Sequence, residues 1–185
     1  MELKSLEISD VVLISPRKFS DDRGYFMETF RENVLSEFVG RDVKFVQDNQ
    51  SFSIHTSTVR GLHFQKPPFA QGKLVRCTQG SIIDVAVDAR AGSKTYGKSV
   101  SAVLSRENGD QLWIPEGFLH GFITLEPDTE VQYKCTNYYD KDSDGNVIWN
   151  DPTLNIDWGV DAKGAFLSEK DKVAPSFDNF ESPFI

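Results

Sequence analysis

The chain has 185 residues, a formal net charge of −8 and a sequence pI near 4.9. A domain of this size can bury a full core, to which 14 Phe, five Tyr and three Trp contribute bulky side chains. The acidic balance argues against general binding to nucleic acid or to an anionic membrane, which needs an excess of positive potential. We therefore expect one domain over residues 1–185, with local Arg and Lys available for a small anionic ligand.

The cysteines and the apolar segments bear on where the protein functions. Cys77 and Cys135 form no CxxC pair, and two cysteines do not make a disulfide framework, so both are expected to be buried as small apolar residues. The segment MELKSLEISDVV has no apolar run long enough for a signal peptide, and no later segment is apolar enough to span a membrane. We expect a soluble protein of the reducing cytoplasm.

In chain order, the first predicted element is a short helix over Arg31–Phe38 that ends at Gly40. The tail beyond about Asp140 is rich in Asp, Asn, Gly and Pro, and is expected to wrap the domain as loops, with one helical turn at Glu169–Lys172. Many short strands, with too few helices for βαβ units, predict an all-β antiparallel sandwich or barrel. These strands are expected at Val59–Phe64, Lys73–Gln79, Ile82–Asp88, Ser99–Leu104, Phe118–Leu125 and Glu130–Tyr138, which are rich in β-branched or aromatic residues and separated by turn signals.

Strand alternation assigns a direction to one tyrosine. Within the last predicted strand, Val131, Tyr133 and Cys135 share one face, whereas Gln132 and Lys134 share the other. Tyr133 is therefore expected to point with the apolar side chains into the barrel, either as a core residue or as a functional one.

The segment GDQLWIPEGFLH fits the second sequence motif of cupin proteins. Gly109, Pro115, Gly117 and His120 occupy its four fixed positions. This spacing places a tight Pro/Gly turn between two strands and directs His120 into the barrel. The segment predicts a cupin jelly roll, that is, a double-stranded β-helix.

The first cupin motif departs from its metal-binding form. That form supplies two His and a Glu, but here His63 is followed by Gln65 at the second His position, and Lys73 replaces the Glu. A divalent metal site requires imidazoles and a carboxylate, and an ammonium group removes a ligand and adds repulsion. We therefore predict no metal, with Lys73 supplying the positive charge.

These side chains together predict proton transfer at a carbon beside a carbonyl. Lys73 can stabilise the negative oxygen of an enolate, and neutral His63 can remove the proton. Tyr133 can return a proton from the opposite face, which inverts the carbon, although the same groups could also catalyse isomerisation. A carboxylate must orient His63, and Glu169 and Asp171 are both candidates.

Six segments, in this order, resemble the dTDP-4-dehydrorhamnose 3,5-epimerase family, and the resemblance covers most of the chain. It implies a cupin jelly-roll barrel with a few short helices, no cofactor, and a homodimer in which one subunit completes the site of the other. The segments are Asp21–Phe26, Phe45–Asn49, Arg60–His63, Gln71–Arg76, Leu112–Phe118 and Tyr133–Tyr139.

The resemblance also implies roles for individual residues. His63 resembles the base, Asp171 the carboxylate that orients it, Tyr133 the acid and Lys73 the group that stabilises the enolate oxygen. Guanidinium groups suit pyrophosphate oxygens. The implied substrate contacts are Arg23 and Arg60 for the pyrophosphate, Tyr139 for stacking on thymine, His120 in the sugar pocket, and Glu28, Gln47, Asn49, Asp144 and Lys170 at other parts of the substrate.

The implied activity is that of an isomerase in dTDP-rhamnose and polysaccharide biosynthesis. The enzyme would epimerise C3 and C5 of dTDP-4-dehydro-6-deoxy-D-glucose, giving dTDP-4-dehydro-L-rhamnose. Alternatives within the same chemistry are a 3- or 5-mono-epimerase and a 3,4-ketoisomerase of a dTDP-4-keto-6-deoxysugar. A cupin that only binds a nucleotide sugar and a metal-dependent oxygenase are further alternatives, and Lys73 disfavours the second of these.

Overall fold

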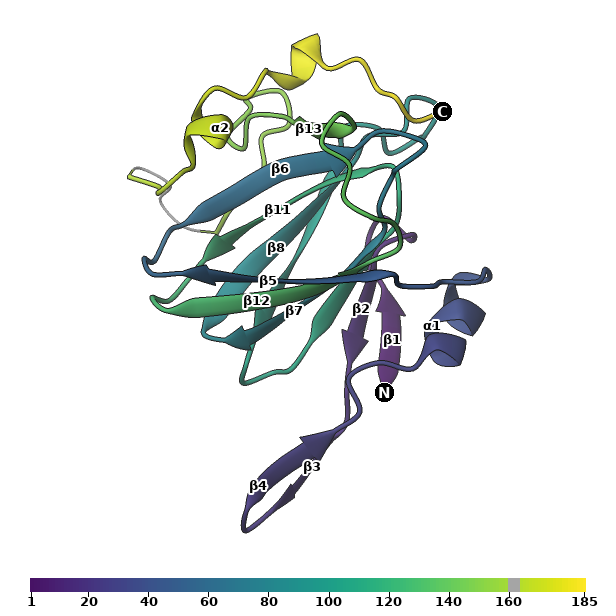
Figure 1. Cartoon of the computed structure of the whole chain (residues 1–185), viewed down its shortest axis with the longest axis vertical. Coiled ribbons are helices and arrows are strands. Elements are labelled where there is room, and N and C mark those ends of the chain that lie inside the picture. The colour runs from purple at the N-terminus through teal and green to yellow at the C-terminus, as the bar shows by residue number, and fades with distance from the viewer. Residues whose placement is uncertain (160–163) are drawn as a thin grey trace.

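The computed structural model of the chain, described here for residues 1–159 and 164–185, contains two antiparallel sheets that stack on each other (Figure 1). The six-stranded sheet has the order β1 (Glu2–Ser5), β2 (Val12–Ser15), β10 (Gln111–Ile114), β7 (Lys73–Gln79), β12 (Thr129–Cys135) and β5 (Gln47–Ser53). The five-stranded sheet has the order β13 (Asp144–Asn146), β6 (Val59–Gln65), β11 (Phe118–Thr124), β8 (Ser81–Asp88) and β9 (Ser99–Ser105). The all-β antiparallel prediction is confirmed.

The helices are few and short, as predicted. Helix α1 (Glu32–Val39) ends at Gly40, whose φ of 72° is the left-handed conformation that glycine adopts at little cost. Helix α2 is the predicted turn Glu169–Lys172, and a 3₁₀ turn follows at Phe177–Asn179. Among the described residues, no helix is both long and apolar enough to cross a membrane.

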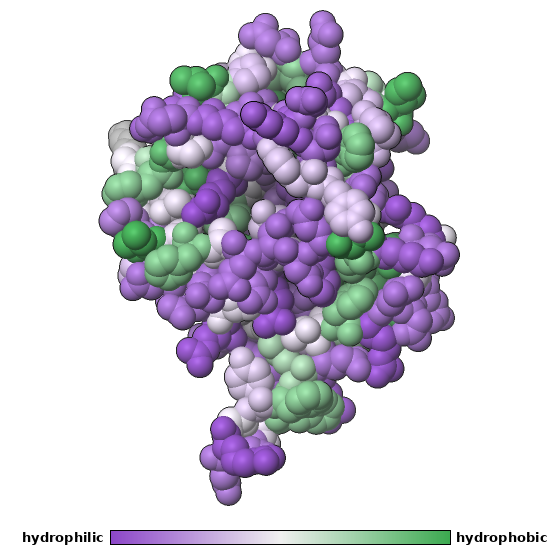
Figure 2. Space-filling model, in the orientation of Figure 1, coloured by the Kyte–Doolittle hydropathy of each residue, from purple (hydrophilic) through white to green (hydrophobic). Residues whose placement is uncertain are grey.

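A two-stranded hairpin extends away from the barrel (Figure 1). It consists of β3 (Lys18–Asp21) and β4 (Gly24–Met27). Phe19 and Phe26 on these strands are exposed, and Figure 2 shows a hydrophilic tip with hydrophobic side chains nearer the body. Large apolar side chains that one chain leaves in solvent on a projecting element are typical of a contact surface.

All six predicted strands are present, but their ends and their number differ from the prediction. The last one ends at Cys135 and not at Tyr138, because Cys135 pairs with the first residue of β5 and with the first residue of β7. Strand β5, with the sequence QDNQSFS, was not predicted because a nearly all-polar segment lacks a strand signature. The other strands missed were β1, β2, β3, β4 and β13, each of three or four residues, whereas β10 is the strand that the cupin motif predicts before its Pro/Gly turn.

Three apolar clusters hold the layers together. One lies between the sheets, and Phe118, Phe122 and Val131 belong to it. The second covers the outer face of the five-stranded sheet, where Leu119 and Ile123 pack against the C-terminal tail. The third lies under α1. Because both faces of β11 are covered, all of its residues are buried, including the polar His120 and Thr124.

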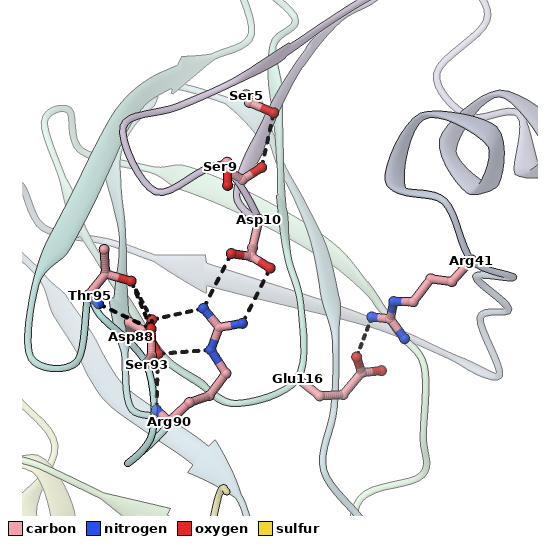
Figure 3. Close-up of polar contacts among 9 residues, drawn as sticks. All are labelled: Ser5, Ser9, Asp10, Arg41, Asp88, Arg90, Ser93, Thr95 and Glu116. Atoms are coloured by element: carbon pink, nitrogen blue, oxygen red, sulfur yellow. Dashed lines mark hydrogen bonds and ion pairs between the residues drawn. The ribbon is translucent and has the colours of Figure 1, made fainter.

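Polar networks join loops at the end of the barrel (Figure 3). The buried carboxylate of Asp88 accepts hydrogen bonds from Arg90 at 2.8 and 2.9 Å and from Thr95 at 2.6 Å, and Arg90 also reaches Asp10. Burial alone would raise the pKa of Asp88, but these hydrogen bonds outweigh it and lower the pKa to about 2. Figure 3 also shows an ion pair between Arg41, just after α1, and Glu116 of the Pro/Gly turn. These contacts fix the turns that position β8 and β11.

Candidate active site

A cleft of about 470 Å³ is lined by residues of β5 in one sheet and of β6 in the other. Side chains from both sheets and from the C-terminal tail line it. The charged and aromatic groups that could act on a ligand are Arg60, His63, Lys73, His120, Tyr133 and Asp171.

Strand register explains why these residues meet. His63 of β6 is paired with His120 of β11 in the five-stranded sheet. In the opposite sheet, Tyr133 of β12 packs against the interior cluster, as strand alternation predicted. The Nζ atom of Lys73 lies 5.9 Å from the centre of the Tyr133 ring. Residues that are far apart in the sequence therefore present acid, base and cationic groups to one cleft.

His63 is held by a carboxylate. Its Nε2 atom lies 2.6 Å from Oδ1 of Asp171, whose side chain is only 3% exposed. The structure thus decides between the two candidates, because the exposed Glu169 pairs with Lys172. Burial acts to raise the pKa of Asp171, but the hydrogen bond and charge of His63, together with Ser168 and Lys170, outweigh burial and lower the pKa. An ionised carboxylate only accepts hydrogen bonds, so Nε2 carries the proton, and in a neutral ring Nδ1 has the lone pair that a base requires.

A second histidine–carboxylate pair lies deeper in the site, and its acidic member was not predicted from the sequence. Nε2 of His120 lies 2.7 Å from Oδ1 of Asp84, which is fully buried on β8. Burial lowers the pKa of His120, and the opposing effect of Asp84 does not fully offset it. The signal for Asp84 was available, because a charged residue inside the apolar run Ile82–Ala86 needs a partner when buried. Its Oδ2 atom has no hydrogen-bond partner among the described residues.

Burial also shifts the protonation of the remaining two groups. It lowers the pKa of Lys73, an effect only partly opposed by Cys135 and Asp84. It raises the pKa of Tyr133, so the phenol stays protonated at neutral pH and can act as a proton donor. The phenol of Tyr133 is thus in the form that a proton donor requires, and the neighbouring Cys135 and Asp84 favour the charged form of Lys73 against the effect of burial.

Most of the predicted substrate contacts also lie at the cleft. Arg60 lines it and is held by Ser53 Oγ at 3.2 Å and by the carbonyl of Phe52 at 2.9 Å. An adjoining pocket of about 470 Å³ shares His63, Lys73, Tyr133 and Lys170 with the cleft. It contains the other predicted contacts Gln47, Asn49, Tyr139, Asp144 and Lys170.

Two predicted contacts lie elsewhere. Arg23 is at the tip of the β3–β4 hairpin, where its side chain is 90% exposed and bonds to Asp21. Glu28 pairs with Arg31 at the end of the same hairpin. Within one chain, neither Arg23 nor Glu28 reaches the cleft, because the backbone of the hairpin leads away from the barrel.

The donor set at the cleft does not suit a divalent metal. The ammonium of Lys73 faces the same cleft as His63 and His120, where a metal site would require a carboxylate. The amide of Gln65 is hydrogen-bonded to main-chain atoms and offers no imidazole. Over the part of the chain that the structure describes, no three His, Cys, Asp or Glu residues are grouped closely enough to hold a metal ion.

The fold and the site define a jelly-roll protein of the cupin class whose cleft is equipped for acid–base chemistry. The family model for dTDP-4-dehydrorhamnose 3,5-epimerase matches residues 5–179. The chain belongs to this family, as its resemblance predicted.

Relatives and solved structures agree with this assignment. A dTDP-4-dehydrorhamnose 3,5-epimerase from Sinorhizobium fredii is 56% identical over 176 residues, which are 95% of this chain and 89% of the relative. The crystal structure of the enzyme from Elizabethkingia anophelis has a TM-score of 0.92 at 45% identity and covers 97% of both chains. A Legionella pneumophila epimerase in complex with dTDP-4-keto-L-rhamnose has a TM-score of 0.92 at 40% identity, covering 97% of this chain and 94% of that one.

Proposed function

We propose that this chain is an isomerase that converts dTDP-4-dehydro-6-deoxy-D-glucose into dTDP-4-dehydro-L-rhamnose by inverting C3 and C5. The observation that carries the proposal is one cleft in which the His63–Asp171 pair and Tyr133 come from opposite sheets, with Lys73 beside the tyrosine. Family membership and the dTDP-sugar named in the Legionella complex support the choice of substrate.

The proposed reaction at each carbon has two proton transfers. His63 removes the proton beside the C4 carbonyl, the electron pair of the C–H bond forms a C=C bond, and the π electron pair of the carbonyl moves to its oxygen to give an enolate. Lys73 stabilises that negative oxygen, and Asp171 stabilises the imidazolium. Tyr133 then donates its proton to the opposite face of the carbon, which inverts it and restores the carbonyl. Proton exchange with solvent resets His63 and Tyr133, so no external oxidant or reductant is needed.

The remaining expected contacts would bind the nucleotide. Arg60 would hold the pyrophosphate, His120 would contact the sugar, and Tyr139 would stack on the thymine ring. The adjoining pocket would receive the rest of the substrate through Gln47, Asn49, Asp144 and Lys170.

Arg23 and Glu28 would act in a second copy of the chain. We propose a homodimer in which the β3–β4 hairpin of one subunit reaches the cleft of the other and adds Arg23 to its pyrophosphate contacts. The projecting hairpin and its exposed Phe19 and Phe26 support this arrangement. The proposal includes a single domain over residues 1–185 and a cytoplasmic location, where nucleotide sugars are made.

The decisive experiment follows the reaction by proton NMR in deuterated buffer, with the product trapped by a reductase. Deuterium at both C3 and C5 of an L-rhamnose product is the expected result. Inversion at one carbon would instead identify a mono-epimerase, and a 3-keto product would identify a ketoisomerase. Bound substrate that gains no deuterium would contradict the proposal and indicate a binding protein. His63→Ala should abolish exchange and turnover together.

A further inference from the structure

The loop between β12 and β13, residues 136–143, lies at the mouth of the adjoining pocket, and we refer to it as the mouth loop. It carries Tyr139, whose side chain lines this pocket and is 57% exposed. An exposed ring on a loop is a poor binding surface unless the main chain beneath it is held, because a mobile ring must be ordered when the ligand binds.

A single buried side chain, that of Gln65, makes hydrogen bonds to the main chain on both sides of Tyr139. Nε2 of Gln65 donates to the carbonyl of Tyr138 at 3.0 Å and to the carbonyl of Phe69 at 2.6 Å. Oε1 of the same amide accepts from the N–H of Asp140 at 2.8 Å. Gln65 is only 5% exposed, so water does not compete for these bonds. Both N–H groups of the amide are used, and two of the three bonds are to the residues that flank Tyr139.

Other contacts complete the support from both sheets. The N–H of Tyr139 itself donates to Oε1 of Gln47 on β5 at 2.9 Å. The N–H of Lys66, next to Gln65, donates to the carbonyl of Ser143 at 2.8 Å and closes the loop onto β6. The backbone of the mouth loop is thus bonded at residues 138, 139, 140 and 143, while the Tyr139 ring stays open to the pocket.

We propose that Gln65 is a positioning residue that holds Tyr139 as a preformed platform for the nucleoside ring of the substrate. This inference rests on the proposed function. The position is the one at which the metal-binding form of the cupin motif has its second histidine, and here its side chain is engaged with the main chain. Because affinity falls with the fraction of molecules in the competent conformation, loss of the Gln65 bonds should weaken nucleotide binding without altering the proton transfers at His63 and Tyr133.

The test uses Gln65→Met, which keeps the length of the side chain and removes its hydrogen bonds. Titration calorimetry with dTDP should show a Kd raised at least tenfold, and KM for the dTDP-4-keto sugar should rise in parallel, with kcat within twofold of wild type. The matched control is Gln79→Met, because the Gln79 amide also donates to a main-chain carbonyl, that of Asp128 at 2.8 Å, away from the cleft. The control should leave Kd, KM and kcat unchanged.

A double-mutant cycle separates positioning from general destabilisation. If Gln65 acts through Tyr139, adding Gln65→Met to Tyr139→Ala should weaken dTDP binding no further than Tyr139→Ala alone. Additive effects, an unchanged Kd in Gln65→Met, or a loss of kcat with Kd intact would overturn the inference. Should Gln65→Met not fold, Gln65→Asn keeps the amide but shortens its reach, and the same Kd shift is expected. If the wild-type chain binds dTDP but does not turn over the sugar, the proposed function is refuted. The double-mutant cycle measured by dTDP binding would still test the role of Gln65 in that case.

Discussion

Replacing Asp171 with Asn tests the proposed base most directly, because the change removes one charge and almost no volume. Oδ1 of Asp171 lies 2.6 Å from Nε2 of His63, and the side chain is 3% exposed, so solvent screens this charge little. For charge centres about 4 Å apart at an effective dielectric constant of about 20, the carboxylate stabilises the imidazolium by about 4 kcal/mol. Losing this interaction in the transition state should lower kcat about 10³-fold.

The measurement is initial velocity in a reductase-coupled assay, together with the rate of deuterium incorporation into substrate. Both should fall by the same factor in Asp171→Asn, because the variant affects the step in which the base takes the proton. Glu169→Gln is the matched control: it makes the same chemical change on the same helix, at an exposed carboxylate paired with Lys172. The control should retain wild-type rates. An Asp171→Asn enzyme within about tenfold of wild type in kcat would refute the proposed coupling to His63.

Four other properties can be tested: the role of Tyr133 as the acid, independence from metal ions, the action of the β3–β4 hairpin across subunits, and the stabilisation of the fold by Asp88. Tyr133→Phe should slow inversion, measured by NMR of the trapped product, more than it slows deuterium exchange; normal inversion would exclude this phenol as the acid. Dialysis against a strong chelator should leave turnover intact. A loss of turnover that iron, manganese or zinc restores would contradict the prediction that Lys73 supplies the positive charge in place of a metal. Mixing the Arg23→Ala and His63→Ala proteins should restore about a quarter of wild-type activity. Half of the dimers in a statistical mixture contain one subunit of each variant, and one of the two sites in such a dimer has both His63 and Arg23. No recovery would mean that Arg23 does not act across subunits. The pKa of Asp88 is about 2 in the folded chain, against an ordinary value of 3.8. Its ionised form therefore stabilises the fold by about 2 kcal/mol above pH 4, and this stabilisation is lost as the pH falls toward 2. Chemical unfolding of Asp88→Asn should accordingly show a lower stability at neutral pH and a smaller loss on acidification than wild type.

Local sequence determined much of this protein. The helix before Gly40 and the cupin spacing from Gly109 to His120 follow from short-range rules of capping, turn formation and strand alternation. Alternation alone was enough to direct Tyr133 into the barrel. The lack of a carboxylate at the first cupin motif is also visible in the sequence, because Lys73 occupies its position.

Tertiary structure decided what depends on contacts between distant segments. It selected Asp171 over Glu169 because only one face of a single helical turn reaches His63. It paired His120 with Asp84, and it made a strand of the polar segment Gln47–Ser53, whose edge pairs with β12. Side-chain and strand pairing over long separations depends on packing in three dimensions, which residue type and spacing do not encode locally.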